Sequence, residues 1–569
     1  MNIKPARRQF IRNFTFTTAA VTSALALSAC GGGSTDDGSA VNFLHGVVSG
    51  DPLSDRVILW TRVTPANTTD GKDIAVHWEV ASDEQFTKFV KTGTFSTNAA
   101  RDYTVKVDVT DLSPNSVYFY RFVRNNVYSP VGRTKTLPVG ALNQVKLAVL
   151  TCSNYPAGFF NVYAEVAKLT DIDAVLHLGD YIYEYPRDGY ASQDAAALNR
   201  QVEPRTEIIT LTDYRSRYAI YRTDTDLQAM HAKLPLIAIW DDHEFANDTW
   251  SGGAENHDPA TEGPFSARRA AALQAYHEWM PVRLADATKN DRIYRSFDFG
   301  NLVSLHMLDT RLIGRDKQLS FTSYVGAGGA FDGAKFAADL ADPSRQLMGA
   351  EQTAWLQAQM GKSTATWQIL GQQVLMARMN IPAPLVLQQI SFSNYVALVG
   401  KAQTAPASLT AAERLILAQP AIPYNLDAWD GYAVARETVF GTAKALNKNL
   451  IALAGDTHNS WSSDLADING NAVGVEFGVT SVTSPGFEDI FPTENPLAVA
   501  AGLEQLIGPL VYAETKNRGF MIVTATPGET RAEWRYVSTV KSKTYTMVPG
   551  KTLKTLPGAN NRKLLPVVV

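Results

Sequence analysis

Val145-Lys146-Leu147-Ala148-Val149-Leu150-Thr151-Cys152 is the stretch on which the fold prediction for this 569-residue chain depends. It is a nearly unbroken apolar run that ends at polar residues, as a buried strand of a parallel sheet does. A helical stretch over 159–169 follows, and a second apolar run, 174–178, ends at Gly179-Asp180. The pattern predicts a strand–helix–strand unit whose two strands end at the same edge of a sheet.

The same pattern of an apolar run that ends at polar residues recurs along the chain. Further apolar runs are followed by polar or charged residues, at 236–240, 302–308, 367–370 and 450–454. Ligands of open α/β sheets bind at the carboxyl ends of the strands. We therefore expect a functional site among the residues that directly follow these runs.

Residues 41–138 have a different pattern, with short segments that alternate apolar and polar side chains. Examples are 74–80, 103–109 and 117–123, with a turn at 111–115 before the last of them. About seven such strands predict a small all-β sandwich of the fibronectin-like kind. We expect the larger domain to span 145–540, followed by a C-terminal tail, 541–569.

The first forty residues resemble an export address. Arg7-Arg8-Gln9-Phe10 resembles a twin-arginine signal, and Leu27-Ser28-Ala29-Cys30 resembles a bacterial lipobox in which Cys30 is acylated. This predicts a lipoprotein signal over 1–30, a flexible linker over 31–40, the twin-arginine translocase and a lipid anchor as partners, and a periplasmic or cell-envelope location. The alternative is a disordered basic leader with a chance cysteine.

The net charge and the cysteine content limit which partners and bonds we expect. The formal net charge is −4, which gives no reason to expect a nucleic-acid partner. If Cys30 is acylated, Cys152 has no partner for a disulfide. A lone thiol in an oxidising compartment is buried or bound to something, which is consistent with a metal-binding thiolate.

Asp180 and Tyr183 are three residues apart just after a strand. If the chain turns into a helix there, both side chains fall on one face and can reach one ion. A bridging carboxylate and a phenolate are oxygen ligands suited to iron(III). The alternative is that Asp180 caps a helix and Tyr183 packs in the core.

Two further strand ends carry acids and histidines. Burying the acids of Trp240-Asp241-Asp242-His243-Glu244 without a positive partner would be costly. Asp242 is the better candidate ligand, although the choice between Asp241 and Asp242 stays open. His243 can protonate a substrate oxygen. Asp456 and His458, two apart, could point into the same cleft.

Gly-Asp after one strand, Asp-His-Glu after another and Gly-x-x-His after a late one together resemble the calcineurin-like metallophosphoesterases. The usual pattern has Asn-His-Glu and Gly-His-x-His. Asp242 and Asp456 replace two of its residues, and Cys152 stands where an opening Asp-x-His is usual. These departures, with Tyr183 and the segment 46–52, resemble the PhoD-type alkaline phosphatases over about 41–540.

The resemblance implies an α/β (α+β) metallophosphatase fold, with a two-sheet αββα core after the small sandwich. It implies an Fe³⁺ and Ca²⁺ centre that hydrolyses phosphate monoesters and diesters with a metal-activated water or oxide. Iron would be held by Cys152, Asp180, Tyr183 and His458, and calcium by Asp180, Asp242 and Asp456.

Other assignments are weaker. Asn154, Asn247 and Arg311 are candidate substrate-binding residues, although Arg311 could equally form a structural Asp–Arg pair. Three other functions remain possible alternatives: a phospholipase D-like phosphodiesterase, a different metallohydrolase such as a nucleotidase, and a non-enzymatic surface binding protein.

Overall fold

The structure is a computed structural model that describes residues 41–66, 72–284, 286, 288–326 and 331–567. The predicted signal 1–30, the linker 31–40 and the predicted lipidation residue Cys30 lie outside the described residues. No helix in the described ranges has the length and apolarity needed to cross a membrane.

Two large sheets form the centre of the molecule. The ten-stranded sheet has the order β26-β25-β24-β23-β11-β12-β13-β2-β3-β7, and the seven-stranded sheet has the order β14-β15-β16-β19-β21-β20-β22. In the first, three parallel strands are central: β11 (Val145–Leu150), β12 (Ala174–His177) and β13 (Leu236–Ala238). In the second, four are parallel: β15 (Val303–Met307), β16 (Trp367–Gly371), β19 (Asn449–Ala454) and β21 (Ala472–Gly478). The six predicted apolar runs therefore form six of these seven parallel strands, and β21 was not predicted.

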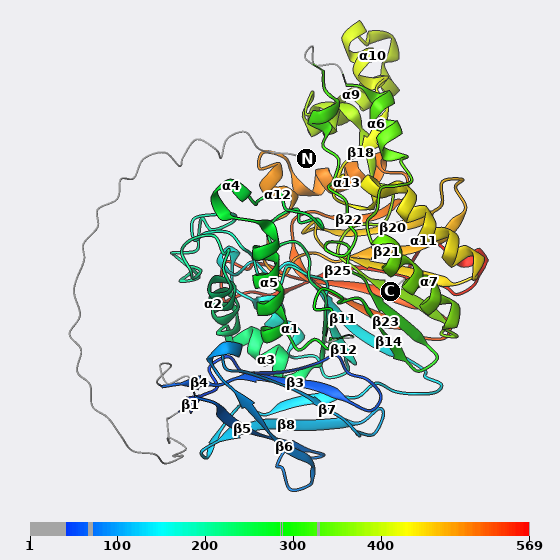
Figure 1. The fold of residues 1–569 in the computed structure, drawn as a ribbon. Helices are drawn as coiled ribbons and strands as arrows, with labels where there is room; N and C mark the ends of the chain where they lie inside the picture. Colours follow the sequence, from blue (N-terminus) through cyan, green and yellow to red (C-terminus); the bar gives the residue numbers. More distant parts are fainter. Residues whose placement is uncertain (1–40, 67–71, 285, 287, 327–330, 568–569) are drawn as a thin grey trace, which may run out of the picture.

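The sheets pack against each other, and helices cover their outer faces. Val149 and Leu176 of the first sheet share one buried cluster with Ile369 and Phe477 of the second. On the outer side of the first sheet lie α1 (Asn161–Val166), α2 (Leu211–Arg222), α3 (Thr225–Lys233) and α5 (Phe265–Trp279), and on that of the second lie α7 (Gly349–Lys362) and α11 (Ala433–Ala445) (Figure 1). The predicted αββα core is confirmed. The helix expected over 159–169 is shorter, ending at Val166.

The N-terminal sandwich shares a sheet with this core. Its strands β2 (Val47–Gly50), β3 (Val57–Arg62) and β7 (Thr104–Val109) extend the ten-stranded sheet, because β2 pairs with β13. The opposite layer contains β5 (Ile74–Ala81), β6 (Phe89–Thr97), β8 (Val117–Arg124), β9 (Val127–Tyr128) and β10 (Gly132–Lys135). The alternating pattern of the sequence follows from this arrangement, since one face of each strand points into the sandwich core.

The end of the chain also joins the first sheet. β23 (Arg518–Ala525) pairs antiparallel with β11. β24 (Thr530–Val537), β25 (Met547–Thr555) and β26 (Leu565–Pro566) continue outward in turn. Residues beyond 540 thus add two strands to the core sheet.

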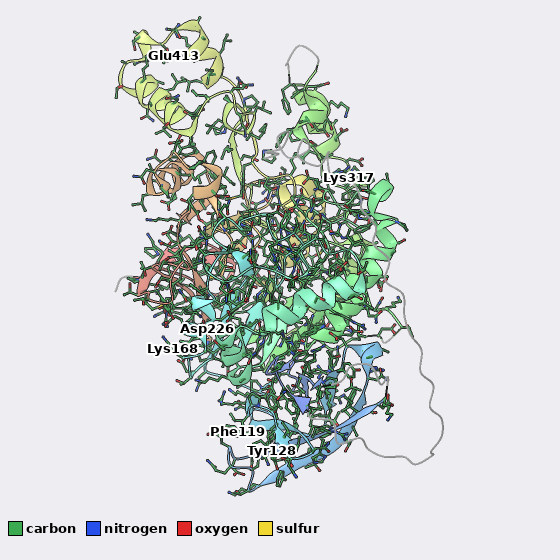
Figure 2. The ribbon with its side chains drawn as sticks, turned by 90° about the vertical axis from the view of Figure 1, so that its left-hand side faces the viewer. Phe119, Tyr128, Lys168, Asp226, Lys317 and Glu413 are labelled. Atoms are coloured by element: carbon green, nitrogen blue, oxygen red, sulfur yellow. The ribbon has the colours of Figure 1, made fainter. Side chains whose placement is uncertain are left out.

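A helical extension projects from the end of the molecule opposite the sandwich (Figure 1). It contains α6 (Gly333–Leu340), α8 (Ala383–Val386), α9 (Phe392–Thr404) and α10 (Ala411–Leu417), with α12 (Phe487–Ile490) and α13 (Pro496–Leu506) at its base. Figure 2 shows Glu413 at the tip of this extension and Phe119 and Tyr128 at the far end of the sandwich.

One buried ion pair ties the N-terminal strands to the second sheet. Asp51, directly after β2, is fully buried and accepts two hydrogen bonds from Arg295 at 2.7 and 2.8 Å. Arg295 begins β14 (Arg295–Phe299) of the seven-stranded sheet and also donates to the Ala238 carbonyl at the end of β13. The backbone N–H of Arg283 donates to the same carboxylate at 2.6 Å. Asp51 therefore connects three parts of the fold.

We predict that Asp51→Ala lowers the free energy of unfolding by about 3–5 kcal/mol, because Arg295 would be left buried without its counter-ion. Urea denaturation of the purified protein measures this loss. The control is Asp55→Ala, which removes an exposed carboxylate of the same loop that pairs only locally with Arg56. Equal stability of the two variants would contradict the assignment.

Candidate metal centre

Four strand-end loops converge at the carboxyl edges of the two sheets. Cys152 lies just after β11, Asp180 after β12, Asp242 after β13 and Asp456 after β19. In the parallel pairings Leu150 is opposite His177, and His177 is opposite Ala238, so the first three loops start side by side. The structure therefore brings together the segments that the sequence analysis singled out.

The first group of ligating atoms contains a thiol, a carboxylate and an imidazole. The Cys152 sulfur, an Asp180 oxygen and a His458 nitrogen all lie within 4.8 Å of one another. The Tyr183 hydroxyl lies 3.0 Å from Asp180 Oδ2 and 3.1 Å from His458 Nε2. Burial, followed by the nearby Asp180 carboxylate, raises the pKa of the Cys152 thiol. All four residues expected to hold iron are therefore neighbours.

Residues 180–183 form a bend and not a helix, and the Tyr183 hydroxyl still reaches Asp180 Oδ2. The carboxylate of Glu244 accepts hydrogen bonds from the backbone N–H groups of Asp180 (3.1 Å) and Tyr181 (2.6 Å). It also accepts from the N–H of Asp241 at 2.7 Å. Glu244 thus fixes two of the loops relative to each other, which is the orienting role that the sequence suggested for it.

The second group of ligating atoms consists of carboxylates. Oxygens of Asp241, Asp242 and Asp456 lie within 4.8 Å of one another, and Asp242 also lies within that distance of Asp180 and His243. Oδ1 of Asp180 and Oδ1 of Asp242 are buried and have no hydrogen-bond partner in the described part of the chain. Buried, unpaired carboxylate oxygens are costly unless a cation is bound nearby.

Arg311 supplies positive charge to this group. Its guanidinium is fully buried and lies 2.5 Å from Asp241, 3.1 Å from Asp456 and 2.8 Å from Asp427. Of the two roles considered for Arg311, contact with phosphate or an Asp–Arg pair, the structure shows the pair. Asp427 was missed by the sequence analysis, because the strand before it, β18 (Ala421–Pro423), is too short to form a recognisable apolar run.

The contacts of Arg311 distinguish Asp241 from Asp242. Asp241 Oδ1 is occupied by Arg311, and burial raises the pKa of Asp241. For Asp242 burial acts in the same direction, but Arg311 and His243 outweigh it and lower the pKa. Asp242 thus keeps its charge more readily, and it also lies within 4.8 Å of Asp180 and His243. Each of the two residues has one buried oxygen without a hydrogen-bond partner in the described ranges, Oδ2 of Asp241 and Oδ1 of Asp242. These contacts favour Asp242 over Asp241 as the ligand.

His243 is held by a buried glutamate. Its Nδ1 lies 2.7 Å from Glu184 Oε2, and its ring stacks on Tyr183 with centroids 4.2 Å apart. Burial opposes a charged imidazole, but the carboxylates of Asp242, Glu184 and Asp180 outweigh it and raise the pKa of His243. Glu184 was missed, since nothing in Tyr183-Glu184-Tyr185 marks the glutamate as buried.

Contacts with Ser484 and Pro485 fix the orientations of Tyr183 and His458. The Nδ1 of His458 lies 2.8 Å from the Pro485 carbonyl, so the proton on Nδ1 leaves Nε2 free as a ligand on the Tyr183 side. Ser484 donates to the Tyr183 hydroxyl at 2.6 Å. Ser484 and Pro485 lie in a loop that no sequence pattern marked.

Four of the six expected metal ligands have a left-handed backbone. The φ angles are 57° at Cys152, 56° at Asp180, 65° at Asp456 and 63° at His458. Such conformations cost non-glycine residues about 1–3 kcal/mol each and cluster at functional sites. Gly179 makes the close approach of two loops possible, because a Cβ there would lie 2.6 Å from the backbone nitrogen of Asp241.

The two groups of ligating atoms border a cleft of about 1120 Å³, a volume suited to a small substrate. His243, Asp456 and His458 line it, together with Asn247 and Lys317. In Figure 2 Lys317 lies between the helical extension and the sandwich. Asn247 accepts a hydrogen bond from the Tyr185 hydroxyl at 3.0 Å.

Asn154, in contrast, is buried behind the cleft and does not line it. Its amide nitrogen lies 3.4 Å from the Tyr190 carbonyl, and its side-chain oxygen has no partner in the described ranges.

Comparisons with known proteins agree with this geometry. A family profile described as PhoD-like phosphatase matches residues 147–534, and one described as PhoD-like phosphatase, N-terminal domain, matches residues 28–138. Alkaline phosphatase D of Bacillus subtilis (strain 168) is 36% identical over 513 residues, which is 87% of this chain and 78% of the relative. The solved structure of PhoD matches with a TM-score of 0.74 at 33% identity, covering 94% of each chain.

Proposed function

The chain belongs to the PhoD-like phosphatase family and is a phosphoric ester hydrolase; on that premise we propose that it is an exported, metal-dependent alkaline phosphatase and phosphodiesterase. The observation that carries the metal dependence is a series of three overlapping groups of ligating residues, each with its ligand atoms within 4.8 Å of one another: Cys152, Asp180 and His458; Asp180, Asp242 and His243; and Asp241, Asp242 and Asp456. Family membership favours this enzyme over a non-enzymatic surface protein.

The residues present fit two different cations. Cys152, Asp180, Tyr183 and His458 would hold Fe³⁺, because thiolate, phenolate and imidazole suit a transition metal. Asp180, Asp242 and Asp456 would hold Ca²⁺, which prefers oxygen ligands alone. The unpaired oxygens of Asp180 and Asp242 support this division. When bound, the cations would stabilise charge on the phosphate and lower the pKa of a bound water.

His243 would donate a proton to the leaving oxygen of the ester. It lies at the surface of the cleft, and Glu184 accepts a hydrogen bond from its Nδ1. The surrounding carboxylates raise the pKa of His243 and so favour the imidazolium, in which Nε2 carries a second proton that can be donated. Asn247 lies on the same wall, and its backbone N–H donates to Glu184 at 2.9 Å. Glu184 is therefore a positioning residue that acts through His243.

We predict that His243→Asn lowers kcat/KM by about 10²–10⁴-fold for an alkyl phosphate, whose leaving group needs a proton. The loss should be much smaller for a nitrophenyl ester, whose leaving group is a stable anion. Glu184→Gln should show the same leaving-group dependence with a smaller loss. His77→Asn, in the sandwich, is the matched control. Equal losses on both esters would rule out proton donation by His243.

We predict that Cys152→Ala lowers the iron content of the purified protein to a small fraction of that of the wild type, because the sulfur ligand is gone. Asp456→Asn should lose calcium and keep iron. Elemental analysis of the three proteins measures both metals alongside phosphatase activity. If iron and activity both survive Cys152→Ala, the metal assignment is wrong.

The proposed export rests on the sequence of residues 1–30. In a bacterium with a twin-arginine translocase, replacing Arg7 and Arg8 by Lys should keep the protein in the cytoplasm. Cys30→Ala should release it from the membrane fraction. Cell fractionation measures both outcomes, and unchanged fractionation of both variants would contradict the proposal.

A further inference from the structure

An apolar cavity lies beside the cleft, at the base of the helical extension. Its volume is about 450 Å³, within the range of small-ligand sites. Its buried wall is formed by Leu385, Phe392, Trp461, Phe487, Val499 and Leu503. These residues come from α8, α9, β20 (Ser460–Ala466), α12 and α13, elements far apart in the sequence.

The cavity adjoins the cleft. Six residues line both: Val386, Gln388, Gln389, Tyr424, Phe487 and Ile490. The Tyr424 and Phe487 rings are nearly perpendicular, with centroids 6.2 Å apart. The Trp461 indole N–H donates to the Thr457 hydroxyl at 2.7 Å. Thr457 stands between Asp456 and His458, so one wall of the cavity is bonded directly to the loop that carries two expected ligands.

The residues that line the cavity are unsuited to an anionic group or a sugar. Among the described residues around the cavity there is no Lys, Arg or His, so a second anionic group has no counter-ion there. The one carboxylate, Glu494, accepts a backbone hydrogen bond from Ser393 at 3.2 Å. The polar lining residues Gln388, Gln389, Ser391 and Thr493 are exposed, so a sugar in the depth of the cavity would bury hydroxyls against the apolar wall, which costs free energy. A hydrocarbon chain requires neither a counter-ion nor hydrogen-bond partners.

We propose that this cavity binds an unbranched hydrocarbon chain carried by the alcohol of a phosphate ester whose phosphate lies in the cleft. The inference rests on the proposed function and names its substrate class. The phosphate is held where charged groups gather, while the chain is removed from water between α8, α12 and α13. Burial of the chain supplies binding free energy in proportion to its length.

The test is hydrolysis of n-alkyl phosphates from ethyl to octyl, each below the concentration at which it aggregates. For the wild-type protein kcat/KM should rise by about fourfold for each methylene buried, until the cavity is full. The readout is the ratio of octyl to ethyl kcat/KM, so that a general change in activity cancels.

Two variants change the cavity without touching the cleft. Ile390→Asp places a carboxylate in the apolar wall, and Thr493→Trp fills the space with an indole; neither residue lines the cleft. Both should bring the octyl-to-ethyl ratio close to one. The matched control is Leu497→Trp, an exposed position of α13 outside the lining, which should keep the wild-type ratio.

The outcomes separate this inference from the proposed function. If the wild type hydrolyses the series with no dependence on chain length, the cavity belongs to another occupant and the inference is overturned. A length dependence that both cavity variants retain overturns it as well. If the metal-loaded wild type hydrolyses no ester of the series and no nitrophenyl phosphate, the proposed function itself fails.

Discussion

Mutual repulsion among buried carboxylates is the constraint on which the rest of this structure depends. Asp180, Asp241 and Asp242, which are buried, meet Asp456, which lines the cleft, at the carboxyl ends of strands from both sheets. Such a group is stable only if positive charge is placed within it. Arg311 supplies part of that charge. Oxygens of Asp180, Asp241 and Asp242 remain unpaired among the described residues, and we assign those of Asp180 and Asp242 to cations, so the site and the stability of the core are linked.

The surrounding scaffold has the rigidity that this cluster requires. Glu244 binds three backbone N–H groups of two loops, and the Pro485 carbonyl and Ser484 orient His458 and Tyr183. Left-handed backbone conformations at four ligands persist because these contacts over-determine them. A site whose ligands are preorganised in this way loses little free energy to reorganisation when it binds its ions.

Two parts of the fold that are distant from the ligating residues form the surroundings of the cleft. The sandwich extends the first sheet, and Asp51 fixes it to the second through Arg295. At the opposite end, the helical extension and α13 build the apolar cavity next to the cleft. The chemistry of the cleft and the apolar character of the cavity meet at Tyr424 and Phe487, which line both.

The sequence by itself determined most of the parallel strands, the alternating sandwich strands and the residues that follow the strands, including Cys152, Asp180, Asp242 and Asp456. These are local signals, because a buried strand needs a continuous apolar run and a polar residue marks where it ends. Only the tertiary structure decided that Arg311 pairs with acids, that Glu184 holds His243 and that Glu244 joins the loops of Asp180 and Asp241. Each of those contacts joins residues about sixty or more positions apart. The apolar cavity likewise arises from five separate elements. Charge compensation and cavity formation depend on which side chains meet in space, and no local pattern records that.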